Sequence, residues 1–250
     1  MRFGKRVTVA ARAALFLAAC AALRADSSFT AALKNCTELI GFGPVDFAAA
    51  RALVPASFTL VPFNGSAGLV VRASRCESVR IDGLPAKSAV VAQAGIAVIP
   101  PDGTGDINNY TLLYSTNDDQ LFFALLRAGL PAVLDLALAY EFTPDSTGHG
   151  EMYAAVSPLL QPAWFLTGAA DPPPPGGAPV TANWWYNSLR GTLKMATTIP
   201  SISYGAASFA LHTSRSSTLG KLIGGNTDSA FVLFNARGVF ATGDFAATVK

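Results

Sequence analysis

The stretch 109–142 constrains the fold most, because it predicts a strand, a helix and a second strand in immediate succession. Residues 110–115 have the aliphatic and aromatic content of a short strand. We predict that Asn117 caps the helix, that the carboxylates of Asp118 and Asp119 suit its free first-turn amides, and that Gly129 and Pro131 end it. The apolar stripe of this helix consists of Leu121, Phe122, Leu125 and Leu126.

The second strand is predicted over residues 133–142, where the spacing of apolar residues changes from helical to alternating. Asp135 and Glu141 fall on the opposite face from the apolar residues. The apolar face consists of Leu134, Leu136, Leu138, Tyr140 and Phe142. The pattern therefore predicts a strand with one buried face.

The same stretch, YTLLYSTNDDQLFFALLRAGLPAVLDLALAYEF, resembles the central segment of acetoacetate decarboxylase and its relatives. Residues 53–61, LVPASFTLV, are similar to an early element of that family, and residues 88–100 are similar to the strand on which it places a catalytic glutamate. The run 190–222 has the family's order of Gly, strand, Pro, strand and Gly. The resemblance covers roughly residues 50–239 and implies a β-barrel with a few peripheral helices.

The chain departs from the family at the positions that carry its chemistry. Two consecutive lysines follow the proline in the family, one forming the Schiff base, whereas Ala132 and Val133 stand here. Gln93 stands where the family has its glutamate, and a glutamine cannot exchange a proton. The acid that the family's first barrel strand usually supplies is missing from residues 67–75. The resemblance therefore implies the fold without the Schiff-base activity.

Residues 1–25 have the pattern of an export signal peptide, with basic residues first, then an apolar run, and Ala25 before a polar segment. Two cleavage sites compete. The sequence before Cys20 fits the box at which bacteria attach lipid to a cysteine, whereas cleavage after Ala25 would release a soluble protein. We predict an exported protein that is secreted, periplasmic or lipid-anchored, with the lipid as its one membrane attachment.

Cys36 and Cys76 are the two cysteines that remain after the leader, and export favours a disulfide between them. The alternative is two unpaired buried thiols. Removing the leader also removes five of the 18 basic residues and none of the 16 acidic ones, which leaves 13 against 16. The basic isoelectric point thus belongs to the leader and gives no support for nucleic-acid binding.

Short β-like runs separated by turn signals predict a mostly β (α+β) protein, with residues 26–250 forming a single barrel domain. The predicted strands span residues 58–61, 68–73, 89–99, 110–115, 133–142, 152–156, 192–198, 208–212 and 230–234. Residues 168–179, rich in Pro and Gly, predict an extended surface loop. This loop could instead separate two domains, but the strands after it are needed to close a barrel.

The sequence has no GxSxG, P-loop, HExxH or paired CxxC motif, so we predict no metal site and no cofactor. His149 lies in a Ser-Thr-Gly-His-Gly turn, where we expect a solvated side chain. Gln93, Arg72 and His212 are the candidate ligand-binding residues of a barrel pocket. The alternatives are a strand amide facing water, an exposed strand end, and a barrel histidine with its own protein partner.

Lys194 is the candidate for a relocated catalytic lysine, because it lies within a strand-like run and shares a face with Thr192 and Ala196. If that face pointed inward, desolvation would depress the pKa of the amine and favour the nucleophilic form. The alternative is a lysine on the outer surface of a barrel strand.

Three functions follow as hypotheses. The first is an exported barrel that lacks decarboxylase activity and binds a small apolar or carboxylated molecule. The second is a divergent lyase, a decarboxylase, aldolase or hydratase, that acts on a keto acid. The third is a surface or structural protein without enzymatic activity. The resemblance also permits a homo-oligomer.

Overall fold

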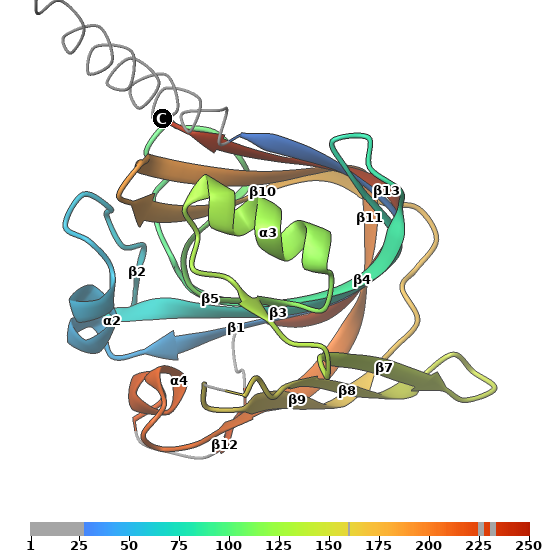
Figure 1. The fold of residues 1–250 in the computed structure, drawn as a ribbon. Helices are drawn as coiled ribbons and strands as arrows, with labels where there is room; N and C mark the ends of the chain where they lie inside the picture. The colour runs from blue at the N-terminus through green and yellow to red at the C-terminus, as the bar shows by residue number, and fades with distance from the viewer. Residues whose placement is uncertain (1–27, 160, 225–227, 231–233) are drawn as a thin grey trace, which may run out of the picture.

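The computed structural model describes residues 28–159, 161–224, 228–230 and 234–250 (Figure 1). The predicted signal peptide and Cys20 lie outside the described residues. The described strands are β1 (Phe29–Val45), β2 (Pro62–Phe63), β3 (Ser66–Ile81), β4 (Lys87–Ala97), β5 (Ile107–Thr116), β6 (Val133–Leu134), β7 (Ala139–Pro144), β8 (Gly150–Val156), β9 (Trp164–Ala170), β10 (Ala178–Ser188), β11 (Gly191–Thr213), β12 (Asp228–Ala230) and β13 (Phe234–Val249). The described helices are α2 (Phe47–Leu53), α3 (Asp119–Ala128) and α4 (Thr218–Leu222).

Strands β10, β5, β4, β3, β1, β13 and β11 are hydrogen-bonded in that order, and β10 also pairs with β11, so that the described strands include a closed ring (Figure 1). Within the ring, β5 and β10 pair in parallel and the other neighbours are antiparallel. The prediction of a mostly β fold built on a barrel-like closed sheet is confirmed.

A second layer, which we call the outer sheet, packs against the outside of the ring. It consists of β7, β8, β9, β12 and the end of β11, which pairs with β9 from Ala207 onward. Ring strands are therefore buried on both faces: on β3, Leu69 and Val71 join the core toward the outer layer, and Val70 joins the core inside the ring. This two-sided burial explains the nearly continuous apolar sequence of β3.

Helix α3 fills the ring at one end (Figure 1). Its N-cap is Asp118, which accepts hydrogen bonds from two first-turn amides, and not Asn117 as predicted. Asn117 Oδ1 instead accepts from Val90 N at 2.8 Å, because that side chain is needed by the neighbouring strand. The predicted stripe is also partly wrong, since Leu126 is 41% exposed. The buried residues of α3 are Leu121, Ala124, Leu125 and Ala128.

The continuous strand predicted over residues 133–142 is wrong, because the chain turns between β6 and β7. Asp135 is 3% exposed and Leu136 is 79% exposed, which reverses the prediction at these two positions, whereas Leu138 and Tyr140 are buried as predicted. The Asp135 carboxylate accepts hydrogen bonds from Ala137 N at 3.0 Å and from Ser157 N at 2.8 Å. The carboxylate thus takes the place of a strand partner, and the alternating sequence pattern does not show this.

The predicted loop 168–179 is shorter in the structure and spans residues 171–177. Its ends belong to strands, because Ala170 pairs with Ala207 and Ala178 pairs with Ile202, both on β11. Hydrogen bonds to β11 therefore extend the two strands into positions for which the Pro-rich and Gly-rich composition predicted a loop.

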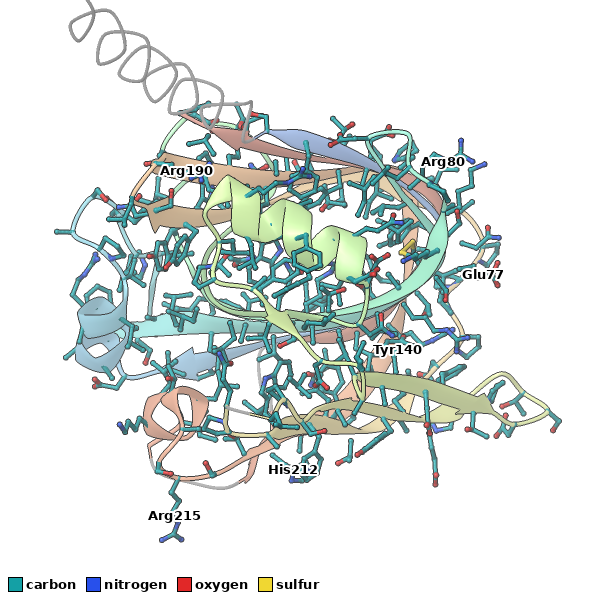
Figure 2. All side chains as sticks on the ribbon, viewed as in Figure 1. Glu77, Arg80, Tyr140, Arg190, His212 and Arg215 are labelled. Carbon is teal, nitrogen blue, oxygen red and sulfur yellow. A yellow bond between two sulfur atoms is a disulfide. The ribbon has the colours of Figure 1, made fainter. Side chains whose placement is uncertain are left out.

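Cys36 and Cys76 form a disulfide with an S–S distance of 2.04 Å, as predicted. The two residues lie directly opposite each other on β1 and β3, and Figure 2 shows the disulfide in yellow. None of the described helices has the length and apolar content to cross a membrane.

Candidate ligand site inside the ring

Arg72 lies on the face of β3 that points into the ring, opposite the face that packs toward the outer sheet. Gln93 of β4 is its direct partner in the sheet register, and Glu38 of β1 lies two positions from its partner on the other side. Arg72 Nε and Nη2 are each 2.6 Å from Glu38 Oε2, and Nη1 donates to Gln93 Oε1 at 2.8 Å. Strand register therefore brings two of the predicted ligand residues together, with Glu38 as a third.

Tyr204 of β11 completes this group, which we call the polar cluster: Glu38, Arg72, Gln93 and Tyr204. The Tyr204 hydroxyl donates to Glu38 Oε1 at 3.1 Å. Burial, reinforced by the charge of Glu38, raises the pKa of Tyr204, so that the phenol remains a neutral donor. Burial alone would lower the pKa of Arg72, but the charge of Glu38 and their hydrogen bond raise it. The cluster therefore holds one ion pair with no net charge.

The alternatives for Arg72 and Gln93 are wrong. Gln93 is 2% exposed and does not face water, and the Arg72 side chain is 13% exposed, far from that of an exposed strand end. Glu38 was not identified from the sequence, because the family resemblance places the expected acid in residues 67–75, which lie on β3. One signal could have found it: Glu38 shares a strand face with Cys36 and Ile40, so it is a charged residue on an otherwise apolar face.

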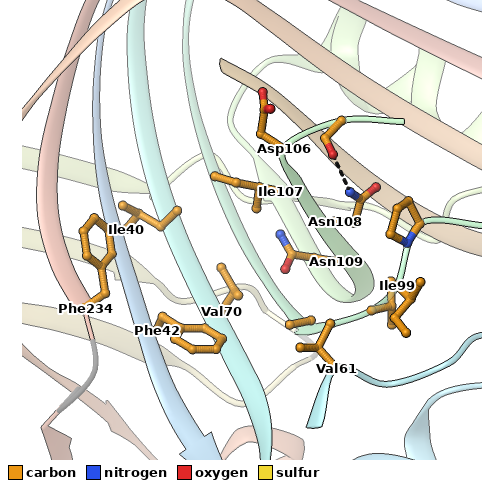
Figure 3. Close-up of a pocket in the computed structure, with 14 residues that line it drawn as sticks. Ile40, Phe42, Val61, Val70, Ile99, Asp106, Ile107, Asn108, Asn109 and Phe234 are labelled. Atoms are coloured by element: carbon orange, nitrogen blue, oxygen red, sulfur yellow. Dashed lines mark hydrogen bonds between the residues drawn. The ribbon is translucent and has the colours of Figure 1, made fainter. Parts of the chain in front are cut away.

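An apolar cavity of about 450 Å³, which we call the outer cavity, opens beside this cluster (Figure 3). Its lining comes from β1, β3, the start of β13 and the segment that connects β4 to β5. The lining residues are Ile40, Phe42, Val61, Val70, Ala97, Val98, Ile99, Pro100, Gly105, Asp106, Ile107, Asn108, Asn109 and Phe234. A cavity of this size and composition is typical of a site for a small organic ligand.

Two smaller spaces border the polar cluster, and one of them lies between the cluster and the outer cavity. Ile40, Ile107 and Asn109 line both the outer cavity and a space of about 20 Å³ that reaches Glu38 and Arg72. A further space of about 40 Å³ lies on the Gln93 side of Arg72. Both are large enough only for water-sized molecules. Asn109 therefore lies where the outer cavity borders the smaller space that reaches Glu38 and Arg72.

Asn109 is 1% exposed, and neither its Nδ2 nor its Oδ1 has a hydrogen-bond partner among the described residues. The neighbouring Asn108 differs: its Oδ1 accepts from Trp185 Nε1 and from Asn183 Nδ2, each at 3.0 Å, and its Nδ2 donates to Gly105 O (Figure 3). An unpaired buried donor or acceptor costs about 1–3 kcal/mol. The hydrogen-bonding capacity of the Asn109 amide is thus unused within the described residues.

Lys194 lies on the opposite face of β11 from Thr197, which lines the two small spaces. Its Nζ is 2.8 Å from Asp102 Oδ2, and Lys250 Nζ is 3.1 Å from the same oxygen. Burial alone would raise the pKa of Asp102, but the hydrogen bonds from both lysines and from Thr104 lower it. Lys194 therefore holds the segment between β4 and β5 and does not line any of the three cavities.

The two histidines also lie away from these cavities. His212 stacks on Phe165 with ring centres 4.6 Å apart, and its Nε2 is 2.7 Å from Thr167 Oγ1. Figure 2 shows His212 on the outer sheet, so the structure does not bring it to Arg72 and Gln93. His149 is 51% exposed and lies 2.8 Å from Asp171 Oδ1. The described residues contain no group of three or more His, Cys, Asp or Glu side chains that could hold a metal ion.

Ala132, at the position that follows the proline, is buried in the core of the ring, and Val133 begins β6 beside β5. None of the lysines that the structure describes lines the outer cavity or the two smaller spaces. These lysines are Lys34, Lys87, Lys194, Lys221 and Lys250.

A closed ring that is filled by a helix at one end and holds polar groups inside defines a class of barrel-like β folds. Solved structures place the chain more narrowly. It is similar to an acetoacetate decarboxylase at TM-score 0.57, with 11% identity over 88% of both chains. It is also similar to acetoacetate decarboxylase from Legionella pneumophila, at TM-score 0.53 and 11% identity over 88% of this chain and 85% of that one.

A third solved structure extends the likeness to a biosynthetic enzyme. The enduracididine biosynthesis enzyme MppR, complexed with pyruvate, matches at TM-score 0.51 and 11% identity over 89% of this chain and 88% of that one. No protein-family model and no curated protein matches the sequence. The chain has the acetoacetate decarboxylase-like fold, which confirms the fold that the sequence resemblance implied.

Proposed function

We propose that this protein binds a small, mainly apolar molecule in the outer cavity and does not carry out Schiff-base decarboxylation. One observation carries the proposal: an apolar cavity of about 450 Å³ ends at the unpaired, buried amide of Asn109. Ala132 and Val133 stand where the family has its lysine pair, and an amine at that site is what the family's chemistry needs.

We also propose that the protein is exported, as a single domain of residues 26–250. The Cys36–Cys76 disulfide supports export, because such bonds persist in oxidising compartments. Lipidation at Cys20 and assembly into a homo-oligomer stay predictions.

The test is binding of Nile red, a neutral dye that becomes fluorescent in apolar cavities, to the purified protein. The Val70→Phe variant adds a large side chain to the cavity lining and should weaken dye binding at least about tenfold. Val239→Phe makes the same exchange at a residue that is 39% exposed and should leave dye binding unchanged. Absence of dye binding to the unaltered protein, or an equal effect of both variants, would contradict the proposal.

A divergent lyase is the second candidate, and the polar cluster favours it. Glu38 is a buried carboxylate, and a carboxylate in an enclosed site can act as a general base. Pyruvate is the molecule bound in the MppR complex, so pyruvate and acetoacetate are suitable substrates. Turnover followed by NMR that is lost in a Glu38→Gln variant shown to be folded by circular dichroism would establish the lyase. Borohydride trapping of a lysine adduct would establish amine chemistry and overturn the first proposal.

A further inference from the structure

The outer cavity specifies the head group of its ligand, an inference that rests on the proposed function. We propose that the ligand carries a neutral head group that both donates and accepts hydrogen bonds, such as a primary carboxamide, and not a carboxylate. Its apolar body fills the outer cavity, and its head meets Asn109.

The position of Asn109 sets the orientation of the ligand. Asn109 is 1% exposed, whereas Ile99 and Phe234 on the cavity lining are 50% and 47% exposed. The amide thus lies at the closed end and the exposed apolar residues lie at the open end. In Figure 3 the Asn109 side chain lies among Val61, Val70 and Ile107, which offer no hydrogen bond from their side chains. A polar head at the closed end therefore has one amide to pair with.

The chemistry of that amide selects the head group. Nδ2 supplies two donors and Oδ1 accepts, and neither is used within the described residues. A carboxamide or lactam can pair with both atoms at once. A carboxylate only accepts, so it would leave Asn109 Oδ1 unpaired and place a negative oxygen near it.

The charges around the cavity disfavour an anion as well. Asp106 is the one charged side chain of the lining, and it is negative. The nearest cation toward the interior, Arg72, is already paired with Glu38 at 2.6 Å. A carboxylate in the cavity would lose its hydration without gaining an uncompensated positive partner.

Three probes with the same seven-carbon alkyl chain attached to the carbonyl carbon test the head group: octanamide, octanoate and 2-nonanone, a methyl ketone. Each is titrated at pH 7 into the purified protein loaded with Nile red, and dye displacement gives the affinity. Octanamide should bind at least about tenfold more tightly than octanoate, with the ketone in between because it accepts but does not donate.

The Asn109→Leu variant keeps the side-chain size and removes both polar atoms. It should still bind Nile red and 2-nonanone, but its affinities for octanamide and 2-nonanone should agree within about twofold. Asn187→Leu is the matched control, because Asn187 lies outside the three cavities and should leave the preference for octanamide intact. Thermal unfolding of each variant checks that it is folded.

The outcomes separate the two proposals. Octanoate binding as tightly as octanamide, or a preference for octanamide that survives Asn109→Leu, overturns the head-group inference and leaves the cavity as a ligand site. Nile red binding without displacement by any of the three probes does the same. Failure of Nile red itself to bind overturns the proposed function, and the inference falls with it.

Discussion

Leucine in place of Glu38 should lower the free energy of unfolding by about 3–5 kcal/mol, because it leaves the Arg72 guanidinium buried without a counter-ion. The Glu38 and Arg72 side chains are 4% and 13% exposed, and their nitrogen–oxygen distances are 2.6 Å. Water therefore screens the pair little. Arg72→Met should cost a similar amount, since it leaves the carboxylate with the Tyr204 hydroxyl as its one remaining partner among the side-chain contacts described here.

The double variant Glu38→Leu, Arg72→Met removes both charges together. What remains is the loss of a partner by the Tyr204 hydroxyl and by Gln93 Oε1, at about 1–3 kcal/mol each. The double variant should therefore lose about 2–6 kcal/mol, against roughly 6–10 kcal/mol for the two single losses added together. Urea unfolding followed by tryptophan fluorescence measures all three variants in one double-mutant cycle.

The exposed ion pair Lys87–Asp119 is the matched control, because its distance is also 2.6 Å but its side chains are 44% and 54% exposed. The same cycle with Lys87→Met and Asp119→Leu should give a much smaller coupling energy. Additive losses for Glu38 and Arg72, or a coupling no larger than in this control, would refute the reasoning that burial makes the pair act as a unit.

Three further predictions concern other parts of the fold. Replacing Cys36 and Cys76 with alanine should lower the free energy of unfolding by about 3–4 kcal/mol, since the bond closes a sequence separation of 40 residues, and urea unfolding with and without reductant checks this. Asn109→Leu should raise the thermal unfolding midpoint of the ligand-free protein, because it removes an unpaired buried amide, and a lowered midpoint would contradict this. Asp135→Ala should cost about 1–3 kcal/mol and Leu136→Ser less than about 0.5 kcal/mol in urea unfolding, the reverse of what the alternating sequence pattern implies.

Much of the fold could be predicted because it depends on local and short-range patterns. Acidic residues after residue 117 and Gly129 predict the start and the end of a helix, and the structure has α3 there. The disulfide follows from counting the cysteines outside the leader. The turn after β6 could not be predicted, because the Asp135 carboxylate bonds to Ser157, which is distant in sequence.

The candidate site could be predicted only in part. Arg72 and Gln93 were named from a resemblance and an interrupted apolar run, and the register of β3 and β4 brings them together. Glu38 and Asn109 were missed, because a glutamate and an asparagine within a strand are ordinary until their neighbours are known. Lys194 and Arg72 are both basic residues on apolar strands. Lys194 nevertheless pairs with Asp102 in the segment between β4 and β5, whereas Arg72 pairs with Glu38 inside the ring.

By itself the sequence determined the class of fold, the place of α3, the cysteine pair and the absence of the family's lysines after Pro131. Composition, alternation and helix-end signals act within a few residues, so they can be recognised along a chain. Only the tertiary structure decided that the Asn109 amide is unpaired at the end of a cavity, and that Arg72 is neutralised by Glu38. Ring closure sets both results, because it determines which side chains from distant strands share one enclosed interior from which water is largely excluded.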